Sequence, residues 1–311
     1  MEKTLDLINL VQPHVPFCQE RWMWQYGKGF HGPNRAWVCE DAQKIVGFAG
    51  LIRHRWYILG RQQDCYMPND AMTHPDYRHQ GMHAAVFTMM LEYIKSTGAP
   101  MCYVLPNEKS IREAEKQGWT KVFPMPLVIR ELKTGTGRLS KASVDVDEIT
   151  FFDSRADRLC ESFKDRFHFF HVRDFDYLNW RYVKKPDDTY RIFCVCRGND
   201  LLGYMVFKLY REGSDTIRSH IVDLLVRPEE GAIVDALMGV AVRLSADAGS
   251  KHLSSWMLPH APWYEHFEAW GFVPQPTSRF LCVHEELTTV RIEDLCATTN
   301  WYFTMGDSDV F

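Results

Sequence analysis

The residues best placed to do chemistry lie within residues 69–83, where an apolar run ends, Pro75 marks a turn and a glycine precedes a helical pattern. Apolar residues then recur at helical spacing until Gly98. The first turn of such a helix offers free backbone N–H groups and a partial positive charge, so it attracts phosphate oxygens. Arg78 adds a full charge, and Gly81 lets a pyrophosphate approach the backbone. The pattern therefore predicts a site for a pyrophosphate-bearing ligand.

The elements that must position this loop occur twice in the chain, about 155 residues apart, which is typical of a duplicated domain. The matching landmarks are Trp24-Gln25-Tyr26 with Trp180-Arg181-Tyr182, Gly47 with Gly203, Asp70 with Asp223, Leu105-Pro106 with Leu258-Pro259, and Gly118-Trp119 with Gly271-Phe272. Between the copies, residues 133–138 are polar and glycine-rich, as an exposed connector would be. We therefore expect two domains, 1–135 and 136–311, the second including a C-terminal tail. Each copy alternates strand and helix patterns, so the predicted class is mixed α/β.

The Arg78-x-x-Gly81 loop after a strand and Pro75 resembles the acetyl-CoA loop of the GNAT N-acetyltransferases, and Gly118-Trp119 resembles the family's closing glycine-aromatic pair. The resemblance covers about residues 15–131 and, more weakly, about 172–284. It departs at His83, where the family has glycine or alanine. It implies two tandem GNAT-like domains, each a mixed, mostly antiparallel sheet flanked by helices. Trp180-Arg181-Tyr182 followed by Pro186 resembles a motif of bacterial members associated with surface-polysaccharide or amino-sugar modification.

The resemblance also implies acetyl-CoA as the cofactor. The residues expected to bind it are Met72, Thr73, Arg78, His79, Gln80, Gly81, Met82, His83, Ala84 and Asn107. His79 and His83 are either pyrophosphate ligands or merely exposed. The second copy has Glu229 and Glu230 at the matching loop, where they would repel a pyrophosphate, so we expect one CoA per chain.

Asp70 is the first choice for the base that receives the amine proton, because it lies three residues before Thr73, where the family often places an acid. The alternative is that Asp70 fixes the geometry of strand and loop, because Asp223 occupies the matching position in the degenerate copy.

Asn107 follows Leu105-Pro106 and is expected either to bind pantetheine or an ordered water, or to cap the helix that begins near Ser110. The family's usual tyrosine acid is replaced here by Ala114. Protonation of the leaving thiolate is therefore assigned to Ser110, Tyr103 or water.

Arg181 lies between two large aromatic residues, and such an arginine can clamp an anionic acceptor. Because Trp24-Gln25-Tyr26 carries the aromatics without the arginine, the aromatics are interpreted as core, and the role of Arg181 stays open. No metal site is expected, because the histidines at 168 and 171 have no further ligands at suitable spacing.

The composition is that of an ordinary soluble protein, with 46% hydrophobic residues, 24% charged residues and a net charge of −4 over 311 residues. We therefore expect no nucleic-acid partner, no membrane and a cytoplasmic location. The expected function is acetyl-CoA-dependent N-acetyl transfer to a small-molecule amine, with the amino sugar of a surface polysaccharide preferred. The alternatives are transfer of a longer acyl group and a non-catalytic acyl-CoA-binding scaffold; a homodimer remains open.

Overall fold

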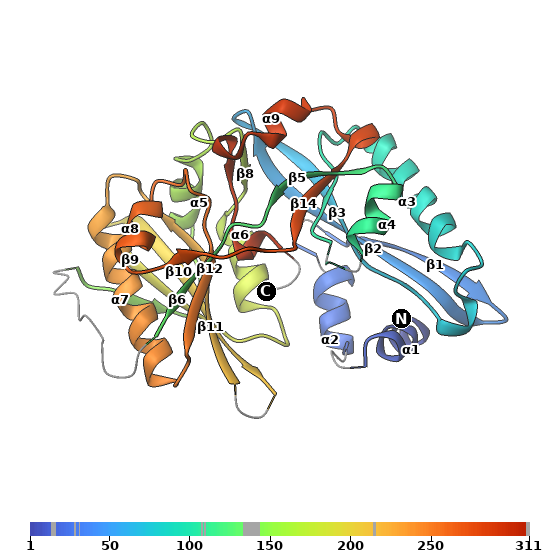
Figure 1. Ribbon diagram of the computed structural model, residues 1–311, viewed down its shortest axis with the longest axis horizontal. Coiled ribbons are helices and arrows are strands. Elements are labelled where there is room, and N and C mark those ends of the chain that lie inside the picture. Colours follow the sequence, from blue (N-terminus) through green and yellow to red (C-terminus); the bar gives the residue numbers. More distant parts are fainter. Residues whose placement is uncertain are drawn as a thin grey trace.

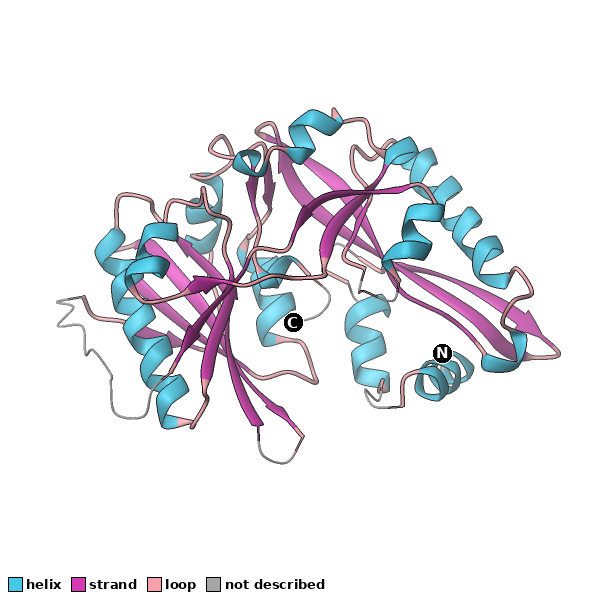
Figure 2. Cartoon of the chain, in the orientation of Figure 1, coloured by secondary structure: helices cyan, strands magenta, loops and turns pink. Residues whose placement is uncertain are grey.

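The computed structural model describes residues 1–13, 17–27, 29–30, 32–106, 108, 110–132, 144–213 and 216–308. Its chain forms two lobes of similar build, each with strands covered by helices (Figures 1 and 2). The N-terminal elements are α1 (Glu2–Val11), α2 (Gln19–Trp22), the π-helical turn η1 (Met23–Gly27), β1 (Arg35–Asp41), β2 (Lys44–Ile58), β3 (Arg61–Thr73), η2 (Pro75–Tyr77), α3 (Met82–Thr97), β4 (Tyr103–Val104), α4 (Ile111–Lys116), β5 (Trp119–Pro124) and β6 (Leu127–Glu131).

From α6 onward, the second half repeats most of this order. Its elements are β7 (Asp147–Ile149), α5 (Arg155–Glu161), β8 (Phe169–His171), α6 (Phe175–Leu178), the π-helical turn η3 (Asn179–Val183), β9 (Tyr190–Arg197), β10 (Asp200–Glu212), β11 (Thr216–Val226), α7 (Gly231–Asp247), β12 (His252–Trp256), α8 (Tyr264–Ala269), β13 (Val273–Pro274) and β14 (Phe280–His284). The tail adds η4 (Glu285–Leu287), α9 (Ile292–Cys296), η5 (Thr298–Asn300), β15 (Trp301–Tyr302) and η6 (Met305–Asp307).

In each half, three antiparallel strands precede a long helix: β1, β2, β3 and α3 in the first, and β9, β10, β11 and α7 in the second. Each long helix is followed by a short strand, a short helix and another strand. The sequence landmarks fall at matching places in the two halves, so the repeat seen in the sequence is also a repeat of structure.

The two halves exchange their last strands. β6 pairs antiparallel with β12 and β13 in the second half, whereas β14 lies between β4 and β5 in the first. Figure 1 shows green β6 within the yellow and orange lobe and red β14 beside β5 in the other. Residue 135, the expected boundary, lies outside the described residues. The expected segment 1–135 therefore lends β6 to a sheet of the second half, and the expected segment 136–311 lends β14 to a sheet of the first.

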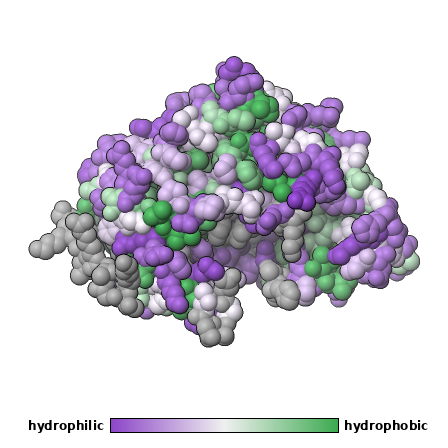
Figure 3. All heavy atoms as spheres, viewed as in Figure 1, coloured by the Kyte–Doolittle hydropathy of each residue, from purple (hydrophilic) through white to green (hydrophobic). Residues whose placement is uncertain are grey.

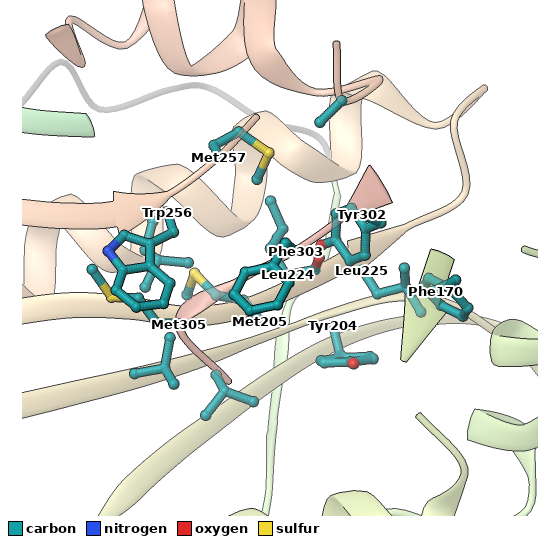
Figure 4. Packing of buried hydrophobic residues seen from close by; sticks show 14 of the residues in the cluster. Phe170, Tyr204, Met205, Leu224, Leu225, Trp256, Met257, Tyr302, Phe303 and Met305 are labelled. Atoms are coloured by element: carbon teal, nitrogen blue, oxygen red, sulfur yellow. Dashed lines mark hydrogen bonds between the residues drawn. The ribbon is translucent and has the colours of Figure 1, made fainter. Parts of the chain in front are cut away.

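The tail and β8 join the first sheet as well. β8 pairs antiparallel with the end of β2, and β15 pairs in parallel with β8. Tyr302, Phe303 and Met305 are almost fully buried against residues of β10 and β11, including Met205 and Leu224 (Figure 4). The hydrophobic core therefore runs across both halves.

The exterior is mostly polar on the face seen in Figure 3, where apolar groups are scattered among hydrophilic ones. Among the described residues, no helix is long and apolar enough to cross a bilayer.

Candidate functional site

The predicted strand-turn-helix is present. β3 ends at Thr73, the turn η2 follows, and α3 begins at Met82 with Gly81 at its N-cap. Gly81 has a φ of 79°, and a Cβ added there would meet no atom within 4 Å, so this glycine is required by backbone conformation rather than by space. The first-turn amides of α3 have no acceptor within the helix, and exposed Arg78 lies immediately before them. The free amides at this end of α3 can donate hydrogen bonds to phosphate oxygens.

The residues expected to bind the cofactor differ in exposure. His79, Gln80 and Ala84 are exposed, Met82 and Thr73 are half-buried, and Met72 is buried. Met72 packs in a cluster with residues of α1, so a ligand at this strand would meet its backbone rather than its side chain. The roles of these residues in binding stay predictions.

His83 is half-buried and stacks on Phe87, with ring centroids 5.5 Å apart. Burial lowers the pKa of His83 below its usual value, so the ring is mainly neutral at pH 7. A neutral imidazole can still donate a hydrogen bond to a phosphate, but it adds no full charge.

β3 and β4 separate from each other near the turn that joins β3 to α3. Within the described residues, β3 is linked to the segment just before β4 by an isolated bridge between Tyr66 and Cys102, supported by a 3.2 Å hydrogen bond from the Tyr66 amide to the Met101 carbonyl. Beyond it β4 pairs with β14 instead. Asn107 lies outside the described residues. Ser110 is exposed at the N-cap position of α4 and is not among the residues that line the cavity described below.

Asp70 sits at a β-bulge in β3, opposite the shift in register between Phe48 and Gly50, and its φ is 50°. Its Oδ2 accepts hydrogen bonds from Gln25 Nε2 at 2.7 Å, Tyr26 OH at 2.7 Å and Asn69 Nδ2 at 3.1 Å. Within the part of the chain that the structure describes, Oδ1 accepts none. The carboxylate is therefore held firmly by one oxygen, while the other is available to receive a proton.

Tyr26 is buried, and this burial together with the charge of Asp70 raises its pKa well above the usual value. The phenol therefore stays protonated and donates to Asp70. A Cβ at position 50 would lie 2.1 Å from the Tyr26 hydroxyl oxygen, so Gly50 is needed for this contact.

Asp223, the counterpart of Asp70, is in a different environment. Its side chain is 1% exposed and accepts from Tyr182 OH at 3.1 Å, as Asp70 accepts from Tyr26. Asp223 also accepts hydrogen bonds from Arg173, from Thr304 of the tail and from Tyr204 OH. The shared tyrosine contact supports a structural role for the carboxylate in both halves, but the tail covers Asp223, whereas Asp70 borders a cavity.

A cavity between the two halves contains Asp70. Its cavity volume is about 40 Å³, and the space rises to about 450 Å³ only when the open solvent at its mouth is included. Its lining residues are Arg21, Trp24, Gln25, Ile52, His54, Met67, Asn69, Asp70, Tyr177, Trp180, Arg181, Lys185 and Ser308. The rings of Trp24 and Trp180 stack with their centroids 4.6 Å apart. The Trp24 indole N–H donates to the Trp180 carbonyl at 2.7 Å, and the Trp180 indole N–H donates to the Trp24 carbonyl at 3.1 Å. The two Trp-x-Tyr motifs therefore join the halves at this cavity.

Arg181 lines the cavity but is 4% exposed. Its Nε donates to the Gly306 carbonyl at 3.3 Å, its Nη2 to the Ser308 carbonyl at 3.2 Å and its Nη1 to Tyr190 OH at 3.0 Å. The guanidinium therefore fixes the tail as a wall of the cavity, a role that the sequence did not predict. Trp180 and Tyr182 beside it are buried.

Two further cavity residues escaped the sequence analysis. Lys185 is 8% exposed and forms an ion pair with Asp188. It lies close after Trp180-Arg181-Tyr182, so proximity to that motif was an available signal. His54 on β2 places Nδ1 2.5 Å from Tyr103 OH, and nothing in its sequence surroundings marks it. Among the described residues, no group of three or more His, Cys, Asp or Glu side chains could hold a metal ion.

Residues 1–122 match the model of a family described as an acetyltransferase (GNAT) domain. No curated protein matches the chain significantly. A GCN5-related N-acetyltransferase from Anabaena variabilis is similar in structure, with a TM-score of 0.68, 13% identity and coverage of 91% of this chain and 70% of that one. A probable N-acyltransferase from Enterococcus faecalis has a TM-score of 0.67 and 13% identity, with coverage of 91% of this chain and 69% of that one. Saccharomyces cerevisiae N-myristoyltransferase with bound myristoyl-CoA has a TM-score of 0.58 and 10% identity, with coverage of 91% of this chain and 78% of that one.

Residues 1–122 therefore match a GNAT acetyltransferase domain, and the protein is an acyltransferase. The likeness to the solved structures extends over 91% of the chain and defines its fold. The predicted fold class and enzyme class are confirmed.

Proposed function

We propose that the protein is an acetyl-CoA-dependent N-acetyltransferase that acts on a small-molecule amine. The observation that carries this proposal is Asp70, whose carboxylate borders the cavity from the same strand that leads into the N-terminus of α3. Acetyl-CoA would supply the thioester that the amine attacks directly. The loop of residues 72–84, with Arg78 and the first amides of α3, would hold its pyrophosphate.

In this scheme Asp70 Oδ1 takes the proton that the amine loses as the amide forms. Tyr26, Gln25 and Asn69 keep the carboxylate in place through Oδ2. Tyr103 is buried, which raises its pKa well above the usual value, and its hydroxyl is engaged by His54. It is therefore a poor proton donor, and exposed Ser110 or water is the better candidate for the leaving thiolate.

One CoA per chain is part of the proposal. In the second half, exposed Glu229 and half-buried Glu230 precede α7, and Glu230 is paired with Arg197 at 2.8 Å. The two carboxylates at the N-terminus of α7 would repel a pyrophosphate and so disfavour its binding there.

The preferred acceptor remains an amino sugar of a surface polysaccharide, by resemblance to bacterial members of the family. Transfer of a longer acyl group is the second candidate, because one similar structure holds myristoyl-CoA. A non-catalytic acyl-CoA-binding scaffold is the remaining alternative.

Calorimetric titration tests the cofactor part of the proposal, with acetyl-CoA and myristoyl-CoA as probes. We expect one acetyl-CoA site per chain. Arg78→Glu should weaken it by about 2–3 kcal/mol, or roughly 30- to 150-fold, because a charged contact to phosphate is reversed. Arg61→Glu, an equally exposed charge at the start of β3, serves as the control and should bind normally.

Thiol release with a panel of amines then separates catalysis from mere binding. Two sites per chain, or full affinity in Arg78→Glu, would contradict the proposed cofactor site. Binding without thiol release from any amine would favour the scaffold, and tighter binding and faster turnover of myristoyl-CoA would favour the longer acyl group.

A further inference from the structure

We propose that two copies of the chain associate through β1, whose outer edge pairs antiparallel with β1 of the second copy and so extends the first sheet across a dimer. The inference goes beyond the proposed acyl transfer, because β1 contributes no residue to the cavity that contains Asp70.

β1 differs from the other edge strands of the molecule. It pairs with β2 on one side, and no described strand pairs with its other side. The other described edge strands are short or contain a residue that protects an edge: β4, β7, β13 and β15 have two or three residues, β5 contains Lys121 and Pro124, and β3 contains Pro68. β1 has seven residues and neither lysine nor proline. Its backbone is therefore able to pair with a further strand.

The second half of the chain shows what covers the same edge there. β9 is the counterpart of β1, because Val195 pairs with Gly203 as Cys39 pairs with Gly47, both 156 residues further on. The outer edge of β9 pairs antiparallel with β7. This edge of the repeated sheet therefore accommodates an antiparallel strand.

The charges on β7 and β9 indicate what a covering strand brings. Arg191, the counterpart of Arg35, donates two hydrogen bonds to Glu148 of β7, at 2.7 and 2.6 Å. Arg35 is exposed, and its guanidinium lies 4.4 Å from the ring centroid of Tyr93. Among the residues that the structure describes, none forms an ion pair with Arg35. A strand that covers β1 should therefore bring a carboxylate to Arg35.

β1 itself supplies such a carboxylate. In an antiparallel pair with Val38 on the two-fold axis, Arg35 of each copy lies opposite Asp41 of the other, which gives two ion pairs per interface. Arg35 and Asp41 share one face of the strand, because they are an even number of residues apart. Val38 is 48% exposed on the other face and meets its own copy. The irregularity between β1 and β2 adds an extra residue, Val46, to β2, so β1 stays regular.

The remaining charges on β1 fit this register. Asp41 accepts a hydrogen bond through Oδ2 from Tyr77 OH at 2.7 Å. Glu40 lies on the face of Val38, opposite Ala36 of the second copy, and pairs with Lys3 of its own chain at 3.8 Å. No like charges are directly opposite each other, so the strand is complementary to itself.

Sedimentation velocity of the full chain, up to about 100 μM, tests this interface. We expect a concentration-dependent dimer with twice the chain mass of 36.4 kDa. Arg35→Glu and Asp41→Arg should each raise the dissociation constant of the dimer at least about tenfold, because two attractive contacts become repulsive. An equimolar mixture of the two variants should regain the unchanged chain's dissociation constant within about threefold, since each altered residue then faces the other.

Two control variants separate this effect from general damage. Arg61→Glu makes the same charge change at the exposed start of β3, and Tyr77→Phe removes the hydrogen bond to Asp41. Both should dimerise like the unchanged chain. A monomer at every concentration, or a dimer that both charge variants leave unaltered, would overturn the proposal. Neither result bears on acyl transfer, which thiol release measures separately.

A cysteine on the two-fold axis tests the register. Cβ atoms of directly opposite residues are about 5 Å apart, so Val38→Cys should form a disulfide between copies when diamide takes the hydrogens of the two thiols. Ala36→Cys is the matched control on the same face, because position 36 lies about 13 Å from its copy, beyond the reach of a disulfide. The unchanged chain gives the background from the native cysteines. Equal cross-linking at both positions, or none at position 38, would overturn this pairing.

Discussion

Replacement of Arg173 by methionine should be among the most destabilising single changes in the chain. Its guanidinium is 1% exposed and lies between two buried carboxylates. Nη2 is 2.7 Å from Asp307 Oδ2, Nε is 3.2 Å from Asp223, and Nη2 also donates to Thr304 Oγ1 at 3.1 Å. Removal of one partner from a buried ion pair typically costs about 3–5 kcal/mol, because the remaining charge is left uncompensated. That is a large part of the roughly 5–15 kcal/mol that stabilises most proteins.

The loss should depend on pH. Burial raises the pKa of Asp307 to about 6, with Arg173 acting in the opposite direction. Because this folded-state pKa is above the value of the unfolded chain, the contribution of Asp307 to stability is fully present below the unfolded pKa and is lost as pH rises through about 6. Without the guanidinium the pKa of Asp307 should rise further. Arg173→Met should therefore lose less stability at pH 5.5 than at pH 7.5.

Urea unfolding of the full chain at these two pH values measures both effects. Addition of Asp307→Asn to Arg173→Met should recover more than about 1 kcal/mol, because it removes one of the stranded charges. Arg197→Met, which breaks the pair of exposed Arg197 with Glu230, should cost less than about 1 kcal/mol. A cost below 1 kcal/mol for Arg173→Met at pH 7.5, or an equal cost at both pH values, would refute this reasoning.

Two further changes test the site and the exchanged strands. Asp70→Asn should lower turnover by about 10²- to 10⁴-fold with unchanged CoA affinity and unfolding, whereas a loss of stability with normal turnover would make Asp70 structural. A chain that ends at residue 275 lacks β14, so β4 and β5 lose the strand between them. We expect it to lack the near-ultraviolet circular dichroism of the full chain, and a native-like spectrum would show that the first sheet closes without β14.

Local patterns predicted what local forces determine. The helical spacing from Met82 to Gly98 and the glycine at position 81 define α3 as observed, because amphipathic periodicity and a left-handed cap are properties of the segment itself. The repeat was visible for the same reason, since Tyr26 and Tyr182 make the same contact to a strand aspartate in both halves.

The rest depends on contacts between distant segments. β6 and β14 each follow the other elements of their own repeat, and nothing within either strand specifies that it pairs in the opposite half. Arg181 looked free to clamp a ligand, but its donors are directed at backbone carbonyls of the tail, which the motif does not reveal. The burial of Lys185 likewise arises only when the chain is folded.

The exchange of β6 and β14 sets an order for synthesis. The first lobe lacks its inserted strand until residue 284 has emerged, about 150 residues after β6, which at typical rates is roughly 8–30 s of translation. During that interval the facing edges of β4 and β5 have no strand between them, and β6 has no partner until β12 and β13 appear. The nascent chain therefore carries unpaired strand edges in both halves. Such edges are targets for chaperones, and they can pair with those of a neighbouring nascent chain on the same mRNA. Completion of the cavity that Asp70 lines is thus a late event, reached only when the last tenth of the chain has left the ribosome.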